Sequence, residues 1–359
     1  MMESYFQNVL KQFNIEANMD EYGDGHINET YRIKNQPYLL QRVNTDIFKK
    51  PGEVMENIEN VTEHLRKKIT AAGGDPDRET LTLVKTVDGK TYVEPEPGRV
   101  FRVYKFIENA VSYNKVESAE QFYNVARAFG KFQNMLADFP AEKLYETIPE
   151  FHNTPNRVNQ LREAIQNDAA KRAASVKEEI DFALARVEEM DAVLKAMAEG
   201  LVPLRVTHND TKLNNVMFDI DSNEPICVVD LDTVMPGSML YDYGDALRFG
   251  ASTADEDEKD LSKVWFDLEL FKSFSKGYIE EMKEVITEKE LELLPFSAKL
   301  MTYECGIRFL ADYLNGDVYF KVHYPEQNLD RARTQLKLVA DMEAKMDEMM
   351  QIIKEIAAK

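Results

Sequence analysis

The chain has 359 residues, 44% of them hydrophobic, which provides for two domains or lobes and argues against extended disorder. Its net charge of −20 disfavours nucleic acid and anionic membrane surfaces as partners. Two cysteines, Cys227 and Cys305, form neither a disulfide framework nor a zinc site, so a reducing cytoplasm is the expected location. The first residues lack a signal-peptide pattern, and no apolar run approaches the roughly 20 residues of a membrane helix.

The first 108 residues are predicted to form one lobe of α+β type, an antiparallel sheet plus helix. Alternating apolar residues indicate strands, and Asp88-Gly89 is a strong hairpin signal. The expected elements are a helix at 3–13, strands at 30–33 and 38–43, a helix at 51–69, a hairpin of 81–87 with 91–94, and a strand at 100–107.

Residues 109–359 are predicted to form a second, mainly helical lobe. The last helix is rich in Met, Glu and Lys, so we expect it to lie on the surface. The expected elements are helices at 119–139, within 156–200, and at 268–282, 288–314 and 329–357, with short strands at 216–218 and 226–229.

Residues 207–215, T-H-N-D-T-K-L-N-N, carry the most informative pattern. Asp210 precedes Asn215 by five residues, and Asp230 follows a short apolar strand. Phosphoryl transfer uses this layout: a carboxylate takes the proton of the attacking hydroxyl, while amide and carboxylate oxygens hold Mg²⁺. Alone, Asp210 would be interpreted as a surface-loop residue. With its two companions it is predicted to be the catalytic base, and Asn215 and Asp230 the metal ligands.

The neighbours of these residues have less defined roles. His208 is expected to brace the loop from a buried position rather than to act as the base. Asn214 is expected to point away from the site. Asp232 is either a supporting group or an additional metal ligand, and Lys212 either contacts the transferred phosphoryl group or pairs with an acid.

The turn Gly23-Asp24-Gly25 is either a plain hairpin turn or a loop whose backbone N–H groups approach phosphate. We expect the phosphate loop, with His26 facing the cleft.

Charged residues also follow the motif. Asp242 and Asp245 are suited to capping the next helix. Glu304, Arg308 and Asp312 share one helix face, as either a solvated ladder or the lining of a polar cleft.

Together these residues resemble the aminoglycoside phosphotransferase and choline kinase superfamily, whose pattern is H-x-D-x-x-x-x-N followed by a strand Asp. Longer blocks resemble the N-acetylhexosamine 1-kinase family within it. They are Y-G-D-G-H-I-N-x-T-Y at 22–31, R-V-Y-K-F-I-E at 102–108, R-V-T-H-N-D-T-K-L-N-N at 205–215, D-L-D-T-x-M-P-G-S-M-L at 230–240, R-F-G-A-S-T-A at 248–254 and E-C-G-x-R-F-L-A-D-Y-L at 304–314.

The resemblance implies a two-lobed, protein-kinase-like fold that phosphorylates the anomeric C1 hydroxyl of N-acetylglucosamine or N-acetylgalactosamine with ATP and Mg²⁺. It implies that Tyr104, Phe106 and Glu108 lie at the ATP-binding hinge. The residues implied to hold the sugar are His26, Phe249, Arg308 and Tyr319. The expected partners are thus an amino sugar and ATP, and a monomer is favoured.

One position departs from the kinase pattern. Gln41 stands on the third strand where protein kinases have a Lys that holds the α- and β-phosphates. Because an amide carries no charge, we expect Mg²⁺ or Arg42 to neutralise the charge of the phosphates. Gln41 itself is expected to contact the nucleotide. Two alternatives remain: a kinase of the same fold for another hydroxyl acceptor, and a pseudokinase without activity.

Overall fold

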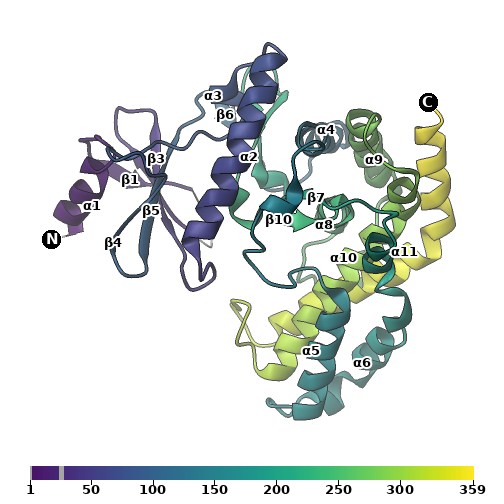
Figure 1. The fold of residues 1–359 in the computed structure, drawn as a ribbon. Helices are drawn as coiled ribbons and strands as arrows, with labels where there is room; N and C mark the ends of the chain where they lie inside the picture. Colours follow the sequence, from purple (N-terminus) through teal and green to yellow (C-terminus); the bar gives the residue numbers. More distant parts are fainter. Residues whose placement is uncertain (1, 24–27) are drawn as a thin grey trace. The chain divides into compact units, whose positions relative to one another are not determined.

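A computed structural model describes residues 2–23 and 28–359 (Figure 1). Asp24, Gly25 and His26, three of the predicted site residues, lie outside the described residues. The chain divides into two compact units, each assembled from three segments. The first contains Met1–Tyr113, Met135–Pro149 and Asn214–Pro236, and the second contains Asn114–Asn134, Glu150–Leu213 and Gly237–Lys359.

The first unit is built on a five-stranded antiparallel sheet with the order β1-β2-β3-β5-β4. In β3 and β5, which pair along their whole length, Gln41 lies directly opposite Arg102. The elements of this part are α1 (Met2–Lys11), β1 (Met19–Glu21), β2 (Glu29–Ile33), β3 (Tyr38–Val43), α2 (Pro51–Ala71), α3 (Pro76–Glu79), β4 (Val93–Glu96) and β5 (Arg99–Lys105).

Alternation along β5 divides its side chains between two faces, because successive side chains of a strand point to opposite sides. Phe101 and Val103 join the apolar cluster that Val9, Leu10 and other side chains form beside α1. Figure 1 shows α1, in purple, beside this sheet. The intervening Arg102 therefore points to the other face although its neighbours are apolar.

The predicted hairpin about Asp88-Gly89 is wrong in its pairing. The turn exists, since the Thr86 amide donates to the Lys90 carbonyl at 2.8 Å. However, residues 81–87 form no strand, and β4 pairs with β5 instead. Gly98, with a φ of 76°, lies between β4 and β5 and permits their tight turn.

A second, three-stranded sheet in the first unit joins β6 (Ala110–Val111), β8 (Val216–Asp219) and β9 (Pro225–Val228). β8 and β9 form an antiparallel hairpin in which Val216 pairs with Val228. Residues just before β8 and just after β9 must therefore lie at the same end of this hairpin.

The second unit is mainly helical. Its capped helices begin where the sequence supplies an acceptor: Thr287 and Glu290 form a capping box at the start of α10. The elements are α4 (Ala119–Met135), α5 (Thr154–Asn167), α6 (Lys177–Leu184), α7 (Ala192–Ala198), β7 (Arg205–Thr207), α8 (Met239–Gly250), α9 (Leu268–Met282), α10 (Glu288–Asn315) and α11 (Gln327–Ala357), with β10 (Met235–Gly237) at the boundary between the units.

The last helix, α11, is less exposed than expected. It lies beside α10 in Figure 1, where both are drawn in light green to yellow. Leu338, Val339 and Met342 are fully buried, so much of this helix belongs to the core and only its other face is solvated.

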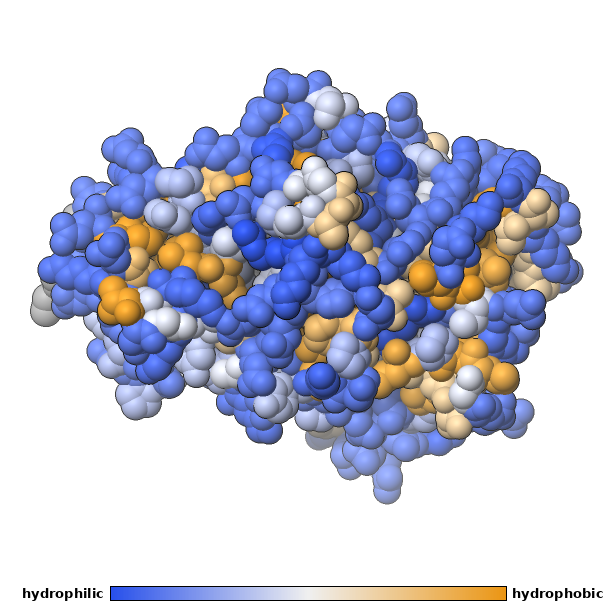
Figure 2. All heavy atoms as spheres, turned by 45° about the horizontal axis from the view of Figure 1, so that its top comes forward, coloured by the Kyte–Doolittle hydropathy of each residue, from blue (hydrophilic) through white to orange (hydrophobic). Residues whose placement is uncertain are grey.

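The face drawn in Figure 2 is mostly hydrophilic, with apolar side chains in separate patches. Among the described residues, no helix is both long and apolar enough to span a membrane.

The close approach of α8 and α10 predicts a steric cost at Gly244. An added Cβ would overlap the Ser297 carbonyl oxygen and lie 2.6 Å from Met301 Cγ. Gly244→Ala should therefore lower the free energy of unfolding by about 2 kcal/mol, the usual cost of overpacking. Gly52→Ala, whose Cβ would meet only the Tyr92 hydroxyl at 3.2 Å, is the control. Equal urea midpoints for both variants would contradict the packing described.

Candidate active site

A cavity of about 440 Å³ lies within the first unit. Apolar side chains, among them Leu39 and Met217, form part of its wall, as expected for a site that receives a flat heterocycle. Polar groups line the remainder. The predicted nucleotide and metal residues found in this lining are Gly23, Gln41, Tyr104, Phe106, Asn215 and Asp230.

Glu108 is not among the lining residues. Its side chain is 69% exposed and pairs with Arg32 at 3.4 Å. The structure thus brings six predicted residues to one cavity and leaves Glu108 at the surface.

Asn215 and Asp230 meet because they flank the β8–β9 hairpin. The Val229 amide donates to the Asn215 carbonyl at 2.9 Å, which ties the two ends together. Asp230 has a φ of 59°, a left-handed conformation that is uncommon outside glycine and recurs at functional sites. Asn214 was expected to point away, but it also lines the cavity. It belongs to a 3₁₀ turn, Leu213–Asn215, so strand alternation does not apply.

The oxygen donors fit Mg²⁺. Asp230 supplies a carboxylate and Asn215 a neutral amide, the hard ligands this ion takes together with phosphate oxygens and water. The described residues contain no group of three His, Cys, Asp or Glu side chains able to hold a metal.

Beside these residues, Arg102 and Asp232 form a buried ion pair. Arg102 Nη1 lies 2.6 Å from Asp232 Oδ1, and the side chains are only 2% and 4% exposed. The Asn28 amide donates to Asp232 Oδ2 at 2.6 Å, and the Arg102 Nε and Nη2 donate to Gln41 Oε1 at 3.1 and 2.9 Å. Burial alone would lower the pKa of Arg102, but the carboxylates of Asp232 and Asp230 raise it.

Arg102 therefore supplies the positive charge that Gln41 cannot. Arg42, the candidate from the sequence, instead pairs with Glu29 at 2.8 Å and is absent from the cavity lining. Glu59 of α2 pairs with Lys85. The carboxylate that pairs with Arg102 is that of Asp232, which agrees with a supporting role for Asp232.

In the second unit, Asp242 organises the loop that carries Asp210. Its carboxylate accepts hydrogen bonds from the backbone amides of His208 (2.8 Å) and Asn209 (2.7 Å) and from the Gln133 side chain (2.7 Å). Burial raises the pKa of Asp242, against the effect of His208 and these donors. Asp242 was expected to cap α8. The cap is Ser238, and Asp242 lies one turn inside the helix.

Asp210 is held between a histidine and a lysine. Its backbone amide donates to Nδ1 of the fully buried His208 at 3.3 Å, so His208 braces the loop as expected. Its carboxylate lies 3.0 Å from Lys212 Nζ. Burial alone would lower the pKa of Lys212, but Asp210 and Asp245 raise it. Lys212 is therefore a cation paired with an acid.

Asp245 extends the series of alternating charges that Asp210 and Lys212 begin. It pairs with Arg248 at 2.9 Å, and Arg248 in turn pairs with Glu256 at 2.8 Å. Burial alone would raise the pKa of Asp245, but Arg248 and Lys212 lower it. Asp245 therefore remains charged within the helix and does not cap it.

Arg308 and Tyr319, two of the residues implied to hold sugar, lie together. The Arg308 guanidinium carbon is 6.0 Å from the Tyr319 ring centroid, 5.7 Å from that of Phe151 and 5.5 Å from that of Phe320. Tyr319 is 69% exposed. This arrangement combines a cation with ring faces, a combination suited to a polar ligand with an apolar side.

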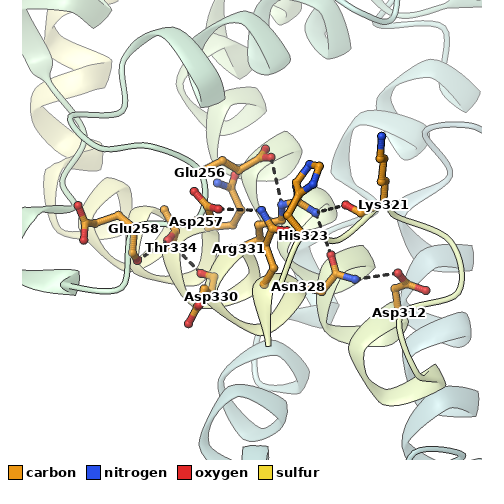
Figure 3. Close-up of polar contacts among 12 residues, drawn as sticks. Glu256, Asp257, Glu258, Asp312, Lys321, His323, Asn328, Asp330, Arg331 and Thr334 are labelled. Atoms are coloured by element: carbon orange, nitrogen blue, oxygen red, sulfur yellow. Dashed lines mark hydrogen bonds and ion pairs between the residues drawn. The ribbon is translucent and has the colours of Figure 1, made fainter. Parts of the chain in front are cut away.

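Asp312 fixes the loop that carries Tyr319. Its carboxylate accepts from the backbone amides of Val318 (3.0 Å), Tyr319 (2.8 Å) and Phe320 (2.9 Å). Figure 3 shows Asn328 bonded to Asp312, and the distance is 2.9 Å. Asp312 is buried, so the ladder of charges on α10 is no solvated face.

Arg331, on α11, joins this loop to the one that follows α8. It donates to the Lys321 carbonyl at 3.2 Å and lies 3.9 Å from Glu256 (Figure 3). Phe249 lines a separate cavity of about 400 Å³, whose lining includes Arg248 and Glu256 but neither Arg308 nor Tyr319. The structure thus brings two of the implied sugar residues together and places the third in a neighbouring hollow.

The buried Arg102–Asp232 pair predicts a large stability effect. Asp232→Asn should lower the free energy of unfolding by about 3 kcal/mol, because it leaves the Arg102 charge buried without a counter-charge. Glu29→Gln, which breaks the half-exposed pair with Arg42 on neighbouring strands, should cost less than about 1 kcal/mol. Urea unfolding measures both. Similar losses would show that burial of the first pair has no energetic consequence.

Glu304 makes the free energy of unfolding of the second unit depend on pH in the acid range. Burial alone would raise its pKa, but the charge of His152 and its hydrogen bond lower it, assisted by Arg308 and Thr154. A carboxylate with a lowered pKa in the folded protein adds stability above its unfolded value of 4.5. This stability is lost as the pH falls through the folded value.

Glu304→Gln should therefore lower the free energy of unfolding by about 2 kcal/mol at neutral pH, the size of a hydrogen bond to a charged group. The deficit should shrink as the pH falls below the unfolded value of 4.5 and through the lowered folded pKa, where the wild-type carboxylate also becomes protonated. Urea unfolding across this range measures it, and a deficit independent of pH would contradict the assignment.

Solved structures with the same fold cover nearly the whole chain. A microcompartment-associated aminopropanol kinase has 16% identity and a TM-score of 0.67, with 97% of this chain and 98% of that one aligned. An aminoglycoside phosphotransferase from Alicyclobacillus acidocaldarius has 12% identity and a TM-score of 0.63 (97% and 96% aligned). Choline kinase from Streptococcus pneumoniae has 11% identity and a TM-score of 0.53 (94% and 99% aligned).

The fold is therefore the kinase-like fold of aminoglycoside phosphotransferases. Residues 19–268 match the APH phosphotransferase enzyme family, a span that includes both the cavity with Asn215 and Asp230 and the loop with Asp210. The chain belongs to the phosphotransferase enzyme family.

Proposed function

We propose that this phosphotransferase transfers the γ-phosphoryl group of ATP to the anomeric C1 hydroxyl of an N-acetylhexosamine, N-acetylglucosamine or N-acetylgalactosamine. The observation that carries the acceptor class is the Arg308 cluster with its aromatic rings. Two structural relatives are described as complexes with GDP and with ADP and spectinomycin, which supports nucleotide and small-molecule ligands here.

On the donor side, the cavity of the first unit receives the nucleotide. Asn215 and Asp230 would hold Mg²⁺, which, when bound, neutralises phosphate charge. Arg102 adds a fixed positive charge on the same lining, oriented by Gln41 and Asp232. A cation held by a carboxylate is also the arrangement of the Lys–Glu pair in protein kinases.

On the acceptor side, Asp210 takes the proton of the attacking hydroxyl. Lys212, whose Nζ lies 3.0 Å from the carboxylate, orients it. The loop is held by Asp242, which fixes the positions of both His208 and Asn209. The base therefore does not have to be ordered during the reaction, which lowers the entropic cost of reaching the transition state.

The local charge favours an acceptor that is not a cation. Arg157 and Arg308 both contact Phe151: Arg157 Nη2 donates to its carbonyl at 2.8 Å, and the Arg308 guanidinium carbon lies 5.7 Å from its ring centroid. Burial and the Arg308 charge both lower the pKa of Arg157. Glu304, one turn before Arg308 on α10, is already engaged by His152 at 2.8 Å. Two guanidinium groups suit carbonyl and hydroxyl oxygens, such as those of an acetamido sugar. Amine-bearing acceptors, such as those named in aminopropanol kinase and choline kinase, would be repelled.

The second candidate is a kinase of the same fold for another uncharged hydroxyl acceptor. A panel of N-acetylhexosamines, plain hexoses, choline and aminoglycosides with ATP and Mg²⁺ separates the candidates. N-acetylhexosamines should be phosphorylated, with the phosphate found at C1 by NMR. Transfer to choline or an aminoglycoside alone would refute the proposal, and phosphorylation of a plain hexose alone would favour the second candidate.

The role of Asp210 has its own test. Asp210→Asn removes the proton acceptor and should lower kcat by about 100-fold or more, while ATP affinity measured by calorimetry stays within about threefold of wild type. The control is Asp221→Asn, at an exposed turn, which should keep wild-type turnover. Near-normal turnover of Asp210→Asn would exclude Asp210 as the base.

A further inference from the structure

Glu304 and Arg308 lie one turn apart on α10, but they do not pair. A glutamate four residues before an arginine is the spacing that most favours a salt bridge on a helix. Among the described residues, however, the Arg308 guanidinium makes no hydrogen bond or ion pair, although its charge contributes to lowering the pKa of Glu304. The groups that it contacts are the rings of Phe151, Tyr319 and Phe320. Other groups must therefore bind the Glu304 carboxylate in place of Arg308.

Both oxygens of the Glu304 carboxylate are already engaged. His152 Nδ1 lies 2.8 Å from Oε1, and the Thr154 hydroxyl donates to Oε2 at 2.6 Å. Glu304 and Thr154 are each 1% exposed, and the His152 side chain is 8% exposed. The His152 ring is itself packed between the rings of Phe151 and Tyr241, with centroids 4.5 and 5.0 Å away. These buried contacts fix the position of the Glu304 carboxylate.

We infer that His152 and Thr154 are positioning residues: they hold Glu304 away from Arg308 and thereby leave the guanidinium available for the acceptor. The inference rests on the proposed role of Arg308 in acceptor binding. A guanidinium that already pairs with a carboxylate has fewer N–H donors left for the oxygens of an uncharged acceptor. Acceptor affinity would then depend on two residues that do not touch the acceptor.

The test uses variants of the full chain. His152→Phe keeps an aromatic ring but removes the donor to Glu304, and Thr154→Val removes the second donor with little change of shape. Each should raise the acceptor KM, His152→Phe by about tenfold, the effect of one charge-assisted hydrogen bond. The KM for ATP should not change. His152→Asn, whose amide can still donate at the position of Nδ1, is the matched control and should stay near wild type.

A second substitution separates this role from a merely structural one. If the freed Glu304 captures Arg308, adding Glu304→Gln to His152→Phe should return the acceptor KM to within about threefold of wild type, because a neutral amide cannot compensate the Arg308 charge. If His152 only stabilises the fold, the second change should make the double variant worse. Thermal unfolding of every variant identifies any that fails to fold, and Thr154→Val then carries the test.

The outcomes distinguish the inference from the proposed function. An unchanged acceptor KM in both His152→Phe and Thr154→Val overturns the inference, as does a double variant no better than His152→Phe. Arg308→Gln is measured in parallel, with whichever acceptor the wild type uses. If Arg308→Gln leaves the acceptor KM unchanged, the acceptor-binding role of Arg308 fails first, whatever the His152 variants do.

Discussion

The cavity of the first unit depends on one buried ion pair, Arg102 with Asp232. Two charges taken out of water cost several kcal/mol each unless their hydrogen-bonding capacity is satisfied. Here Gln41 accepts from the guanidinium and Asn28 donates to the carboxylate. The pair thereby joins β5, β3 and the segment after β9, so the strand that replaces the usual Lys with Gln41 still presents a fixed cation to the same lining.

The second unit uses the same physical device at a different place. Its loop residues are positioned by buried carboxylates whose oxygens accept hydrogen bonds from specific donors: Asp242 holds the Asp210 loop and Asp312 holds the Tyr319 loop. The Glu304 carboxylate accepts hydrogen bonds from His152 and Thr154 in the same way. Each carboxylate is costly to bury, and each is compensated by hydrogen bonds that only one loop conformation can supply. Catalytic loops gain precision from this arrangement.

The sequence predicts the parts whose determinants are local. The bounds of α9 and α10 follow from periodicity and caps, and Asn215 and Asp230 follow from their positions beside two short strands. Pairings that depend on distant residues are not visible in this way. The Asp88-Gly89 pattern predicts a hairpin of residues 81–87 with 91–94, but β4 pairs with β5 instead.

The roles of Arg102, Asp242 and His152 were missed for the same reason, since each depends on a partner more than 30 residues away. Arg102 gave the clearest signal: an arginine within an apolar strand must find a counter-charge. Nor does sequence order reveal that Met135–Pro149 and Asn214–Pro236 belong with the first unit.

In the proposed function, Arg102, held by Asp232, recognises the phosphates of the nucleotide. The most direct measurement is calorimetric titration of ATP and adenosine into the double variant Arg102→Met/Asp232→Leu, because replacing both members of a buried pair by apolar residues usually preserves the fold. Adenosine should bind as it does to wild type, and ATP should bind at least about tenfold more weakly. ATP affinity equal to that of wild type would contradict the account.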